Sequence, residues 1–403
     1  MPLTTAEIMD LENRHTSGAY SKRPIAIVRG EGARLWDADG KEYIDCVGGQ
    51  GSANVGHANP AVVRAISEQA ARLITCNEIF YNDQRAQVEA RLAEIAPPGL
   101  ERVFLCNSGA EAVEGALKFA RLSTGRTGVV ATVRGFHGRT MGALSATWEK
   151  KYREPFAPLI PGFSHIPYND LGKAAAAIGD DTAAVLVEAV QGEGGVRPAS
   201  SDYLCGLSEL CHARGALLIL DEVQTGFGRT GRMFAAEHSG VRPDIMTVAK
   251  SIAGGLPMGA VLLGPRVAPI APLTHGATFG GNPLAAAAAL AAIDYIEAND
   301  LPGHAARLGA HALARLGAID HPAIREVRGL GLLLGVELRH RVSPVLMALA
   351  ERGVLALPAG PNVLRLLPPL VISQTDLDTA IDAIPAALDA VAAMVEETAA
   401  VEG

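Results

Sequence analysis

Apolar and polar positions alternate in different ways along the chain, and the first change of pattern comes near residue 60. Residues 24–49 hold short apolar stretches separated by the turn signals GEG and DADG, which is typical of a small antiparallel meander. Two stretches with apolar residues at helical spacing follow, AVVRAISEQAARLI and QVEARLAEIA. We expect the meander to be the N-terminal piece of a minor domain.

Near-continuous apolar runs between residue 102 and about residue 250 predict strands buried on both faces of a mostly parallel sheet. The runs are RVFLC, GVVATV, AAVLVEAV, ALLIL and DIMTVA, with helical patterns between most of them. Beyond about residue 321, REVRGLGLLLGVEL, VLALPAG and VLRLLPPLVI predict strands, and TAIDAIPAALDAVAAMVEE predicts an amphipathic helix. The expected fold is α/β, with a large domain over residues 61–310 and a small α+β domain from residues 1–60 and 311–403.

Composition and charge narrow the range of partners. A chain of 403 residues favours two unequal domains, and a formal charge of −8 without a long Lys/Arg run gives no attraction for nucleic acid. The five scattered cysteines lack a C-x-x-C pair and indicate reduced thiols. The longest apolar run, Leu284 to Ile293, is shorter than the roughly 20 residues of a membrane span, and the N-terminus lacks a secretory signal. We expect a cytoplasmic protein without membrane contact.

Polar groups follow several predicted strands at their carboxyl ends, where open α/β sheets bind ligands. In the first case, Asn107, Ser108 and Gly109 lead from RVFLC straight into a helix that begins near Ala110. The free N–H groups and positive dipole end of such a helix would cradle a phosphate. The alternative is an ordinary strand-to-helix turn in which Ser108 is the N-cap residue.

The second case is the pair Asp221 and Glu222, directly after the apolar run ALLIL. A buried carboxylate needs a partner, and a protonated ring nitrogen would provide one, because the anion raises the pKa of that nitrogen. The alternatives are a helix N-cap and a metal ligand. No His and no further carboxylate stands at ligand spacing around Asp221, so we expect no metal here.

Two further strand ends carry a lysine and an aromatic residue. Lys250 follows DIMTVA, and desolvation there would lower the pKa of its amine enough for Schiff-base formation. After GVVATV come Phe136, suited to stacking on a planar cofactor, and Arg139, suited to binding a carboxylate. The alternatives are that Lys250 is a solvated lysine, that Phe136 only fills the local core and that Arg139 is only a surface charge. No dinucleotide or P-loop fingerprint supports a dehydrogenase or an NTPase.

Taken together, these motifs resemble the class III (fold type I) pyridoxal-phosphate aminotransferases over nearly the whole chain. The matching segments are NSGAEAVEGALKFAR, GFHGRT, QGEGGVRPA, LLILDEVQTGFGRTG, PDIMTVAKSIAGGLPMGA, HGATFGGNPLA and VLRLLPPLVI. The resemblance implies a seven-stranded-type, mostly parallel sheet flanked by helices, pyridoxal 5'-phosphate as cofactor and a homodimer with shared active sites.

The resemblance also implies roles around the cofactor ring. Lys250 would form the Schiff base and, once released, would shuttle a proton between substrate and cofactor carbons. Asp221 would pair with the pyridinium nitrogen, and Gln224 would donate a hydrogen bond to the phenolic oxygen. Phe136 and Val223 would sandwich the ring.

Further implied roles concern the phosphate. It would lie on the backbone amides around Ser108, Gly109 and Ala110, and Thr278 of the neighbouring subunit would reach it.

Substrate contacts are implied as well. Arg365 would bind the α-carboxylate of 2-oxoglutarate or glutamate, and Glu193 would mask this arginine when the donor offers no carboxylate there. Arg139 would bind the carboxylate of an acylated basic amino acid. Two positions depart from the pattern: Val113 replaces a usual Asn, and Ala277 stands where a hydroxyl residue often touches substrate.

Within the family, the motifs are similar to the acetylornithine branch and to the branch that acts on lysine or ornithine attached to an acidic amino-group carrier protein. The implied reaction moves the terminal amine of such a blocked amino acid to 2-oxoglutarate, in lysine or arginine biosynthesis. The alternatives are an ornithine or 4-aminobutyrate aminotransferase, a glutamate-semialdehyde-type aminomutase and a non-catalytic binding protein. Strict dependence on 2-oxoglutarate would exclude the mutase. The residues leave open the blocking group, the chain length, the direction of flux, and dimer against tetramer.

Overall fold

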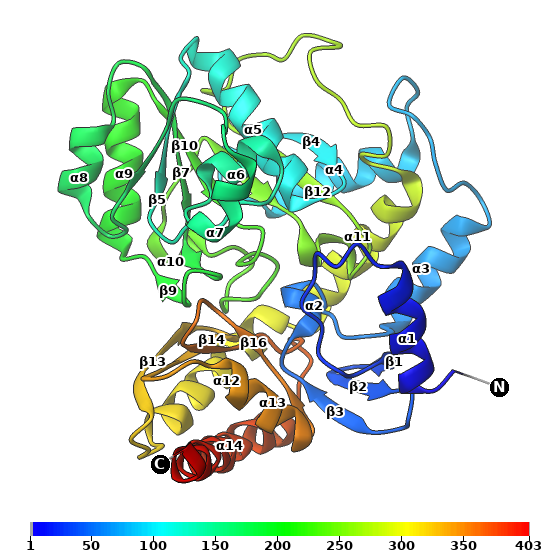
Figure 1. Ribbon diagram of the computed structural model, residues 1–403. Helices are drawn as coiled ribbons and strands as arrows, with labels where there is room; N and C mark the ends of the chain where they lie inside the picture. Colours follow the sequence, from blue (N-terminus) through cyan, green and yellow to red (C-terminus); the bar gives the residue numbers. More distant parts are fainter. Residues whose placement is uncertain (1–2, 403) are drawn as a thin grey trace.

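The computed structural model describes residues 3–402 and is organised around one large sheet with two smaller sheets beside it (Figure 1). The large sheet and its helices form the upper part of the view in Figure 1. The N-terminal strands and the C-terminal lobe lie below it, next to one another. Within residues 3–402, no helix combines the length and apolar character needed to cross a bilayer.

The large sheet has seven strands in the order β4-β12-β11-β10-β7-β5-β6. Its strands are β4 (Arg102–Cys106), β5 (Gly128–Thr132), β6 (Phe163–Ile166), β7 (Thr182–Glu188), β10 (Leu217–Asp221), β11 (Ile245–Val248) and β12 (Gly259–Leu263). All neighbours pair in parallel except β12, which is antiparallel to β11 and β4. The predicted α/β fold with a mostly parallel sheet is confirmed. The strands β6 and β12 were not among the predicted runs.

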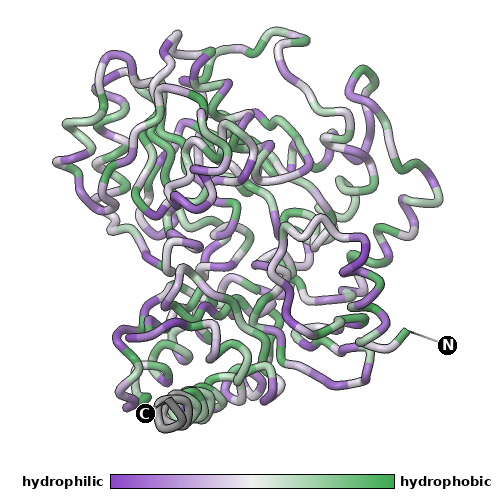
Figure 2. Tube along the Cα trace, viewed as in Figure 1, coloured by the Kyte–Doolittle hydropathy of each residue, from purple (hydrophilic) through white to green (hydrophobic). Residues whose placement is uncertain are grey.

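Both faces of this sheet are covered, which explains its continuous apolar runs. In β7, Ala184 and Leu186 pack towards α5 and α6, whereas Val185 and Val187 pack towards α8 and α9. Figure 2 shows the resulting hydrophobic interior between more polar outer segments. The helices and short segments of this domain are α5 (Gly109–Thr124), α6 (Met141–Ala146), α7 (Lys150–Arg153), η1 (Glu154–Phe156), α8 (Leu171–Ala177), β8 (Val190–Gln191), β9 (Arg197–Pro198), α9 (Ser201–Arg214), α10 (Ala236–Ser239) and η2 (Lys250–Ala253).

The predicted N-terminal meander is present as three antiparallel strands. These are β1 (Ile27–Glu31), β2 (Arg34–Asp37) and β3 (Glu42–Asp45), preceded by α1 (Thr5–His15). The C-terminal strand β15 (Val354–Leu355) adds to β3 in parallel, so residues from both ends of the chain share one sheet. A short turn, α2 (Gly48–Gly51), then leads to α3 (Pro60–Ala70) and α4 (Asp83–Ile95), which pack against α11 (Pro283–Ala298).

The C-terminal lobe is a four-stranded sheet with three helices. Its elements are α12 (Leu301–Gly317), β13 (Ile324–Leu330), β14 (Leu333–Leu338), α13 (Ser343–Glu351), β16 (Leu357–Pro358), β17 (Val363–Leu366) and α14 (Gln374–Glu402). The expected strand over VLRLLPPLVI is wrong beyond Leu366, because the following Pro368 and Pro369 cannot donate ladder hydrogen bonds. The expected domain division at residue 310 falls inside α12, which packs against β13 and α14.

Candidate active site

A cavity of about 190 Å³, here called the inner cavity, opens at the carboxyl ends of the parallel strands. Several residues proposed from the sequence line it: Gly109, Ala110, Phe136, Glu193, Asp221, Val223, Gln224 and Lys250. His137, Gly138, Glu188, Val190 and Thr225 complete the lining. Residues more than 140 positions apart therefore meet because parallel strands end at the same edge.

The start of α5 forms one end of the inner cavity. The Ser108 hydroxyl accepts a hydrogen bond from the Glu111 N–H at 3.2 Å, so Ser108 is the N-cap, as the alternative interpretation held. Helix geometry leaves the N–H groups of Gly109 and Ala110 without intrahelical partners. A Cβ atom at position 109 would lie 2.8 Å from Val223, so only glycine fits here. The capped turn and the anion cradle are therefore compatible.

Asp221 lines the inner cavity and is almost fully buried. Its Oδ1 accepts a hydrogen bond from the Val223 N–H at 3.0 Å, and its Oδ2 lies 2.7 Å from the His137 Nδ1. His137 is buried, and its Nε2 has no hydrogen-bond partner among the described residues. Burial opposes the charged imidazole, but Asp221 and Glu188 raise the pKa of His137 above its usual value. No role was predicted for His137 from the sequence.

Glu188 is a second buried carboxylate that the sequence analysis overlooked. It accepts hydrogen bonds from the backbone N–H groups of Phe136 and Gly192, at 3.1 and 3.2 Å. Burial raises the pKa of Glu188 to about 7. Glu188 could have been predicted from the sequence, because it ends the apolar run of β7 just as Asp221 ends that of β10.

Lys250 follows β11 and begins η2 with a left-handed φ of 49°. This backbone conformation is uncommon for a side chain other than glycine and turns the chain at the base of the inner cavity. Burial lowers the pKa of the Lys250 amine to about 8, and nearby Glu193 and Asp221 only partly oppose this effect. The amine is therefore far easier to deprotonate than a solvated lysine.

Arg365 enters the site from the C-terminal lobe, on β17. Its side chain is 1% exposed, and its Nη2 lies 2.6 Å from Glu193 Oε1. Its Nη1 donates a hydrogen bond to Gln224 Oε1 at 3.0 Å. Since Glu193 is 29% exposed, it can leave the pair, whereas Arg365 is fixed in place.

Phe136 and Arg139 lie on the same stretch of chain after β5. The Arg139 guanidinium lies over the rings of Tyr152 and Phe136, at 3.9 and 5.8 Å from their centroids. Arg139 is exposed and has no carboxylate within 4.0 Å among the described residues. Its charge is therefore held against Phe136 and Tyr152 by stacking and stays free for an anion.

The structure does not bring Thr278 and Ala277 into the inner cavity. Both lie in the loop before α11, where Thr278 and the neighbouring Phe279 are exposed. Val113, which departs from the family pattern, is buried within α5.

The inner cavity fits a planar, anionic cofactor. It offers an amine at Lys250, a buried carboxylate at Asp221, free N–H groups at the start of α5 and an aromatic ring at Phe136. A flat heteroaromatic ring with a phosphate group and a carbonyl carbon has one complement for each of these features.

Comparisons with known proteins agree with this fit. The sequence model of the family described as "Aminotransferase class-III" matches residues 16–388. The chain is 49% identical to "[LysW]-aminoadipate semialdehyde transaminase" of Deinococcus radiodurans, over 94% of this chain and 89% of the relative. It is 46% identical to "Acetylornithine aminotransferase" of Methanothermobacter thermautotrophicus, over 95% and 98%.

A solved structure of ornithine aminotransferase from Toxoplasma gondii superposes with a TM-score of 0.92 at 38% identity. It covers 97% of this chain and 95% of the other, and its description reports pyridoxal phosphate (PLP) at the active site.

Proposed function

The chain belongs to the class-III aminotransferases, and we propose that it moves the terminal amine of an N-blocked basic amino acid to 2-oxoglutarate. The products are the corresponding semialdehyde and glutamate. The blocked substrate is acetylornithine, or lysine or ornithine attached to an amino-group carrier protein. The enzyme depends on pyridoxal phosphate, and the names of its relatives support a place in lysine or arginine biosynthesis.

The ion pair between Arg365 and Glu193 is the observation that carries this proposal. A transaminase alternates between two substrates in one site, and here only glutamate and 2-oxoglutarate would place a carboxylate beside Arg365. With Glu193 at 2.6 Å, the buried arginine stays neutralised while the terminal amine of the other substrate is bound. With Glu193 moved aside, Arg365 offers its planar fork to a carboxylate.

Lys250 supplies the acid–base chemistry. When bound, pyridoxal phosphate supplies an electron sink that makes the carbon bearing the amine acidic enough to lose a proton. The Lys250 amine, with its pKa lowered to about 8, would take that proton from the substrate carbon and return it to a carbon of the cofactor. A base whose pKa lies near the working pH performs both transfers without a large penalty.

Other residues of the inner cavity would hold the cofactor in place. Asp221 would keep a ring nitrogen protonated, because a buried anion raises the pKa of a nearby base. Phe136 and Val223 would stack on the two faces of the ring, and Gln224 would donate its amide to the ring oxygen. The N–H groups of Gly109 and Ala110, with the Ser108 turn, would bind the phosphate.

We further propose that Arg139 binds the carboxylate of the blocked amino acid and that Ala277 lies near the substrate. Arg139 suits this role because its charge is not paired with a carboxylate of the described chain. We also propose that the protein is cytoplasmic and that its domains divide at residues 60 and 310. Docking of an acidic carrier protein is part of the same proposal.

A homodimer with Thr278 reaching the phosphate of the neighbouring subunit completes the proposed assembly. Exposed apolar side chains gather on two adjoining loops: Leu73, Ile74, Ile79, Phe80 and Tyr81 on one, and Leu273 and Phe279 on the other. The buried Arg85 ties these loops together through hydrogen bonds to the carbonyl oxygens of Phe80 and Gly281. An apolar surface of this kind marks a protein interface.

Steady-state assays of the holoenzyme test the proposed reaction. With acetylornithine as donor, glutamate should form only when 2-oxoglutarate is present, because the amine must leave on an acceptor. Lys250→Ala should abolish turnover and the near-violet absorbance of the bound cofactor, whereas Lys173→Ala, at an exposed lysine of α8, should change neither. Turnover without 2-oxoglutarate would indicate an aminomutase, and a protein that stays colourless with added cofactor would contradict the whole scheme.

The carrier-protein substrate needs a separate comparison. Docking of an acidic carrier should weaken as salt rises, because screening reduces attraction between exposed charges. Turnover of carrier-linked lysine should therefore fall with salt while that of acetylornithine stays constant. Equal salt dependence of the two substrates would contradict carrier docking.

A further inference from the structure

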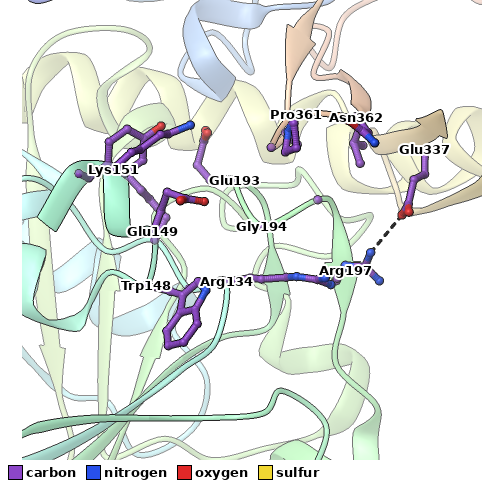
Figure 3. Close-up of a pocket in the computed structure, with 17 residues that line it drawn as sticks. Arg134, Trp148, Glu149, Lys151, Glu193, Gly194, Arg197, Glu337, Pro361 and Asn362 are labelled. Carbon is purple, nitrogen blue, oxygen red and sulfur yellow. Dashed lines mark hydrogen bonds and ion pairs between the residues drawn. The ribbon is translucent and has the colours of Figure 1, made fainter. Parts of the chain in front are cut away.

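A second cavity, here called the outer chamber, adjoins the inner cavity and shares Phe136 and Glu193 with it. Its volume is about 260 Å³, against about 190 Å³ for the inner cavity. The chamber lies between the loops at the strand ends of the large sheet and the turn at Pro361 and Asn362 of the C-terminal lobe (Figure 3). Phe136 and Glu193 therefore lie at the boundary between this chamber and the cavity that holds Lys250.

Three cations line the outer chamber, and two of them have no ionic partner. Arg197 Nη2 lies 3.0 Å from Glu337, the contact drawn as a dashed line in Figure 3. Arg134 and Lys151 have no carboxylate within 4.0 Å among the described residues. Glu149 is the one acid of the lining without a cation partner in that part of the chain. The free positive charge therefore exceeds the free negative charge.

Arg134 stands in an unfavourable position for a simple surface residue. Its φ of 69° is left-handed, and a Cβ atom at position 194 would collide with its carbonyl oxygen, so Gly194 is required opposite it. Arg134 also lies close enough to Arg197 to lower the pKa of that guanidinium, after the larger effect of burial and that of Arg328. The buried Nε of Arg197 has no hydrogen-bond partner among the described residues. Glu337 already lies between Arg197 and Arg328, at 3.0 and 2.7 Å, so Arg134 is the cation of this group that is left for a further anion.

From these observations we propose that the outer chamber is the subsite for the blocking group and selects an acyl group that carries its own carboxylate, which Arg134 and Lys151 contact. The inference rests on the proposed function, since it assigns the far end of that substrate. A neutral acetyl group would use neither the charge nor most of the space. The chemistry is the same for a small dicarboxylic acyl group and for an acidic residue at the end of a carrier.

The preference for an anionic acyl group is measured as the ratio of kcat/KM for N2-succinylornithine to that for N2-acetylornithine. Arg134 and Lys151 are both exposed, so Arg134→Gln and Lys151→Gln should each lower this ratio about three- to five-fold, the effect of losing one exposed ion pair. Glu149→Gln should raise the ratio, because it removes repulsion. Lys173→Gln, a matched loss of one exposed positive charge on α8, should leave the ratio unchanged.

Two results of this experiment would contradict the subsite or the proposed function. A ratio that stays within about two-fold of the wild type in both Arg134→Gln and Lys151→Gln overturns the proposal. If the wild-type enzyme uses neither ornithine derivative and no carrier-linked lysine, the proposed function itself fails. Retention of the bound cofactor's absorbance shows that each variant is folded.

The acyl carboxylate can belong to a small dicarboxylic acyl group or to an acidic residue at the end of a carrier. An ornithine acylated by the end of a short acidic peptide distinguishes these two sources. A carrier is favoured if Arg134→Gln impairs turnover of the peptide conjugate more than that of the succinyl derivative, and a small acyl group is favoured if the order is reversed. If Arg134→Gln impairs turnover of neither the peptide conjugate nor the succinyl derivative, the proposed subsite is wrong.

Discussion

At the scale of single residues, burial has made the amine of Lys250 easy to deprotonate. Lys250 begins η2, just after β11, and its pKa is lowered to about 8. In the cofactor-free protein, its reaction with trinitrobenzenesulfonate should therefore rise with pH around a midpoint near 8, because only the neutral amine attacks the reagent. Peptide mass spectrometry can follow Lys250 beside the exposed Lys173 as a control. Parallel pH profiles for the two lysines would contradict the prediction.

His137 should tune the site through Asp221. Removing its hydrogen bond with His137→Leu leaves part of a buried carboxylate unsatisfied, at a cost of about 1–3 kcal/mol, so kcat should fall about five-fold or more. KM should change little, because His137 acts through its hydrogen bond with Asp221. The pH midpoint of the cofactor's absorbance change should rise, since a neighbouring positive charge is lost.

His137→Asn offers the matched control, because its amide can still donate to Asp221. It should recover most of kcat while keeping the shifted midpoint. A purely structural role would leave the pH midpoint of the absorbance unmoved in both variants.

Part of the site could be predicted residue by residue. Asp221 and Lys250 interrupt apolar strands with charged groups, and parallel strand ends converge, so their meeting follows from the sequence pattern. Glu188 has the same signature and could have been found. His137 could not, because its pairing with Asp221 depends on a loop conformation that leaves no periodic pattern.

At the scale of elements, Glu222 clamps the loop that follows β10. Its carboxylate accepts hydrogen bonds from the Thr225 hydroxyl and from the N–H groups of Ala235 and Ala236, the latter two at 3.1 and 2.7 Å. Burial raises the pKa of Glu222 to about 7 in the folded protein. As pH rises from about 4.5 to 7, the unfolded state loses this proton first, so the free energy of unfolding should fall.

Glu222→Gln removes that titration, so its destabilisation relative to the wild type should be larger at pH 5 than at pH 7.5. Urea unfolding at both pH values measures this difference, with Glu209→Gln on the exposed face of α9 as a control. An equal difference at the two pH values would show that Glu222 does not titrate in this range.

The elements themselves were predicted with uneven success, for physical reasons. Strands buried on both faces could be predicted from their continuous apolar runs, and the meander could be predicted from its turn residues. The antiparallel strand β12 was hidden because its run GAVLL follows directly on a glycine-rich loop. The final predicted strand ends at Leu366, before Pro368, and this limit could have been predicted from the two prolines in the sequence.

At the scale of the whole molecule, the small sheets draw on both ends of the chain. The pairing of β15 with β3 joins residues about 310 positions apart, and no local pattern predicts such a partner. Arg365 reaches the inner cavity from the C-terminal lobe in the same way. The position of this lobe relative to the large sheet therefore fixes the distance between Arg365 and Lys250, and the composition of the chain gives no information on it.

The last prediction concerns the proposed dimer and can be tested by mixing defective subunits. Lys250→Ala and Thr278→Ala should each inactivate or weaken their own homodimer. If Thr278 serves the neighbouring subunit, a mixed dimer has one site with both residues intact, so its activity should be about half that of the wild type. The exposure of Thr278 and its absence from the inner cavity of its own chain motivate this arrangement.

Two different affinity tags allow the mixed dimer to be purified and assayed beside both parent homodimers. If Thr278 instead acted within its own subunit, each site of the mixed dimer would lack one residue, and activity would not exceed the average of the parents. Because the two arrangements differ only in which subunit supplies Thr278, recovery of activity in the mixed dimer can arise only from a site shared between subunits.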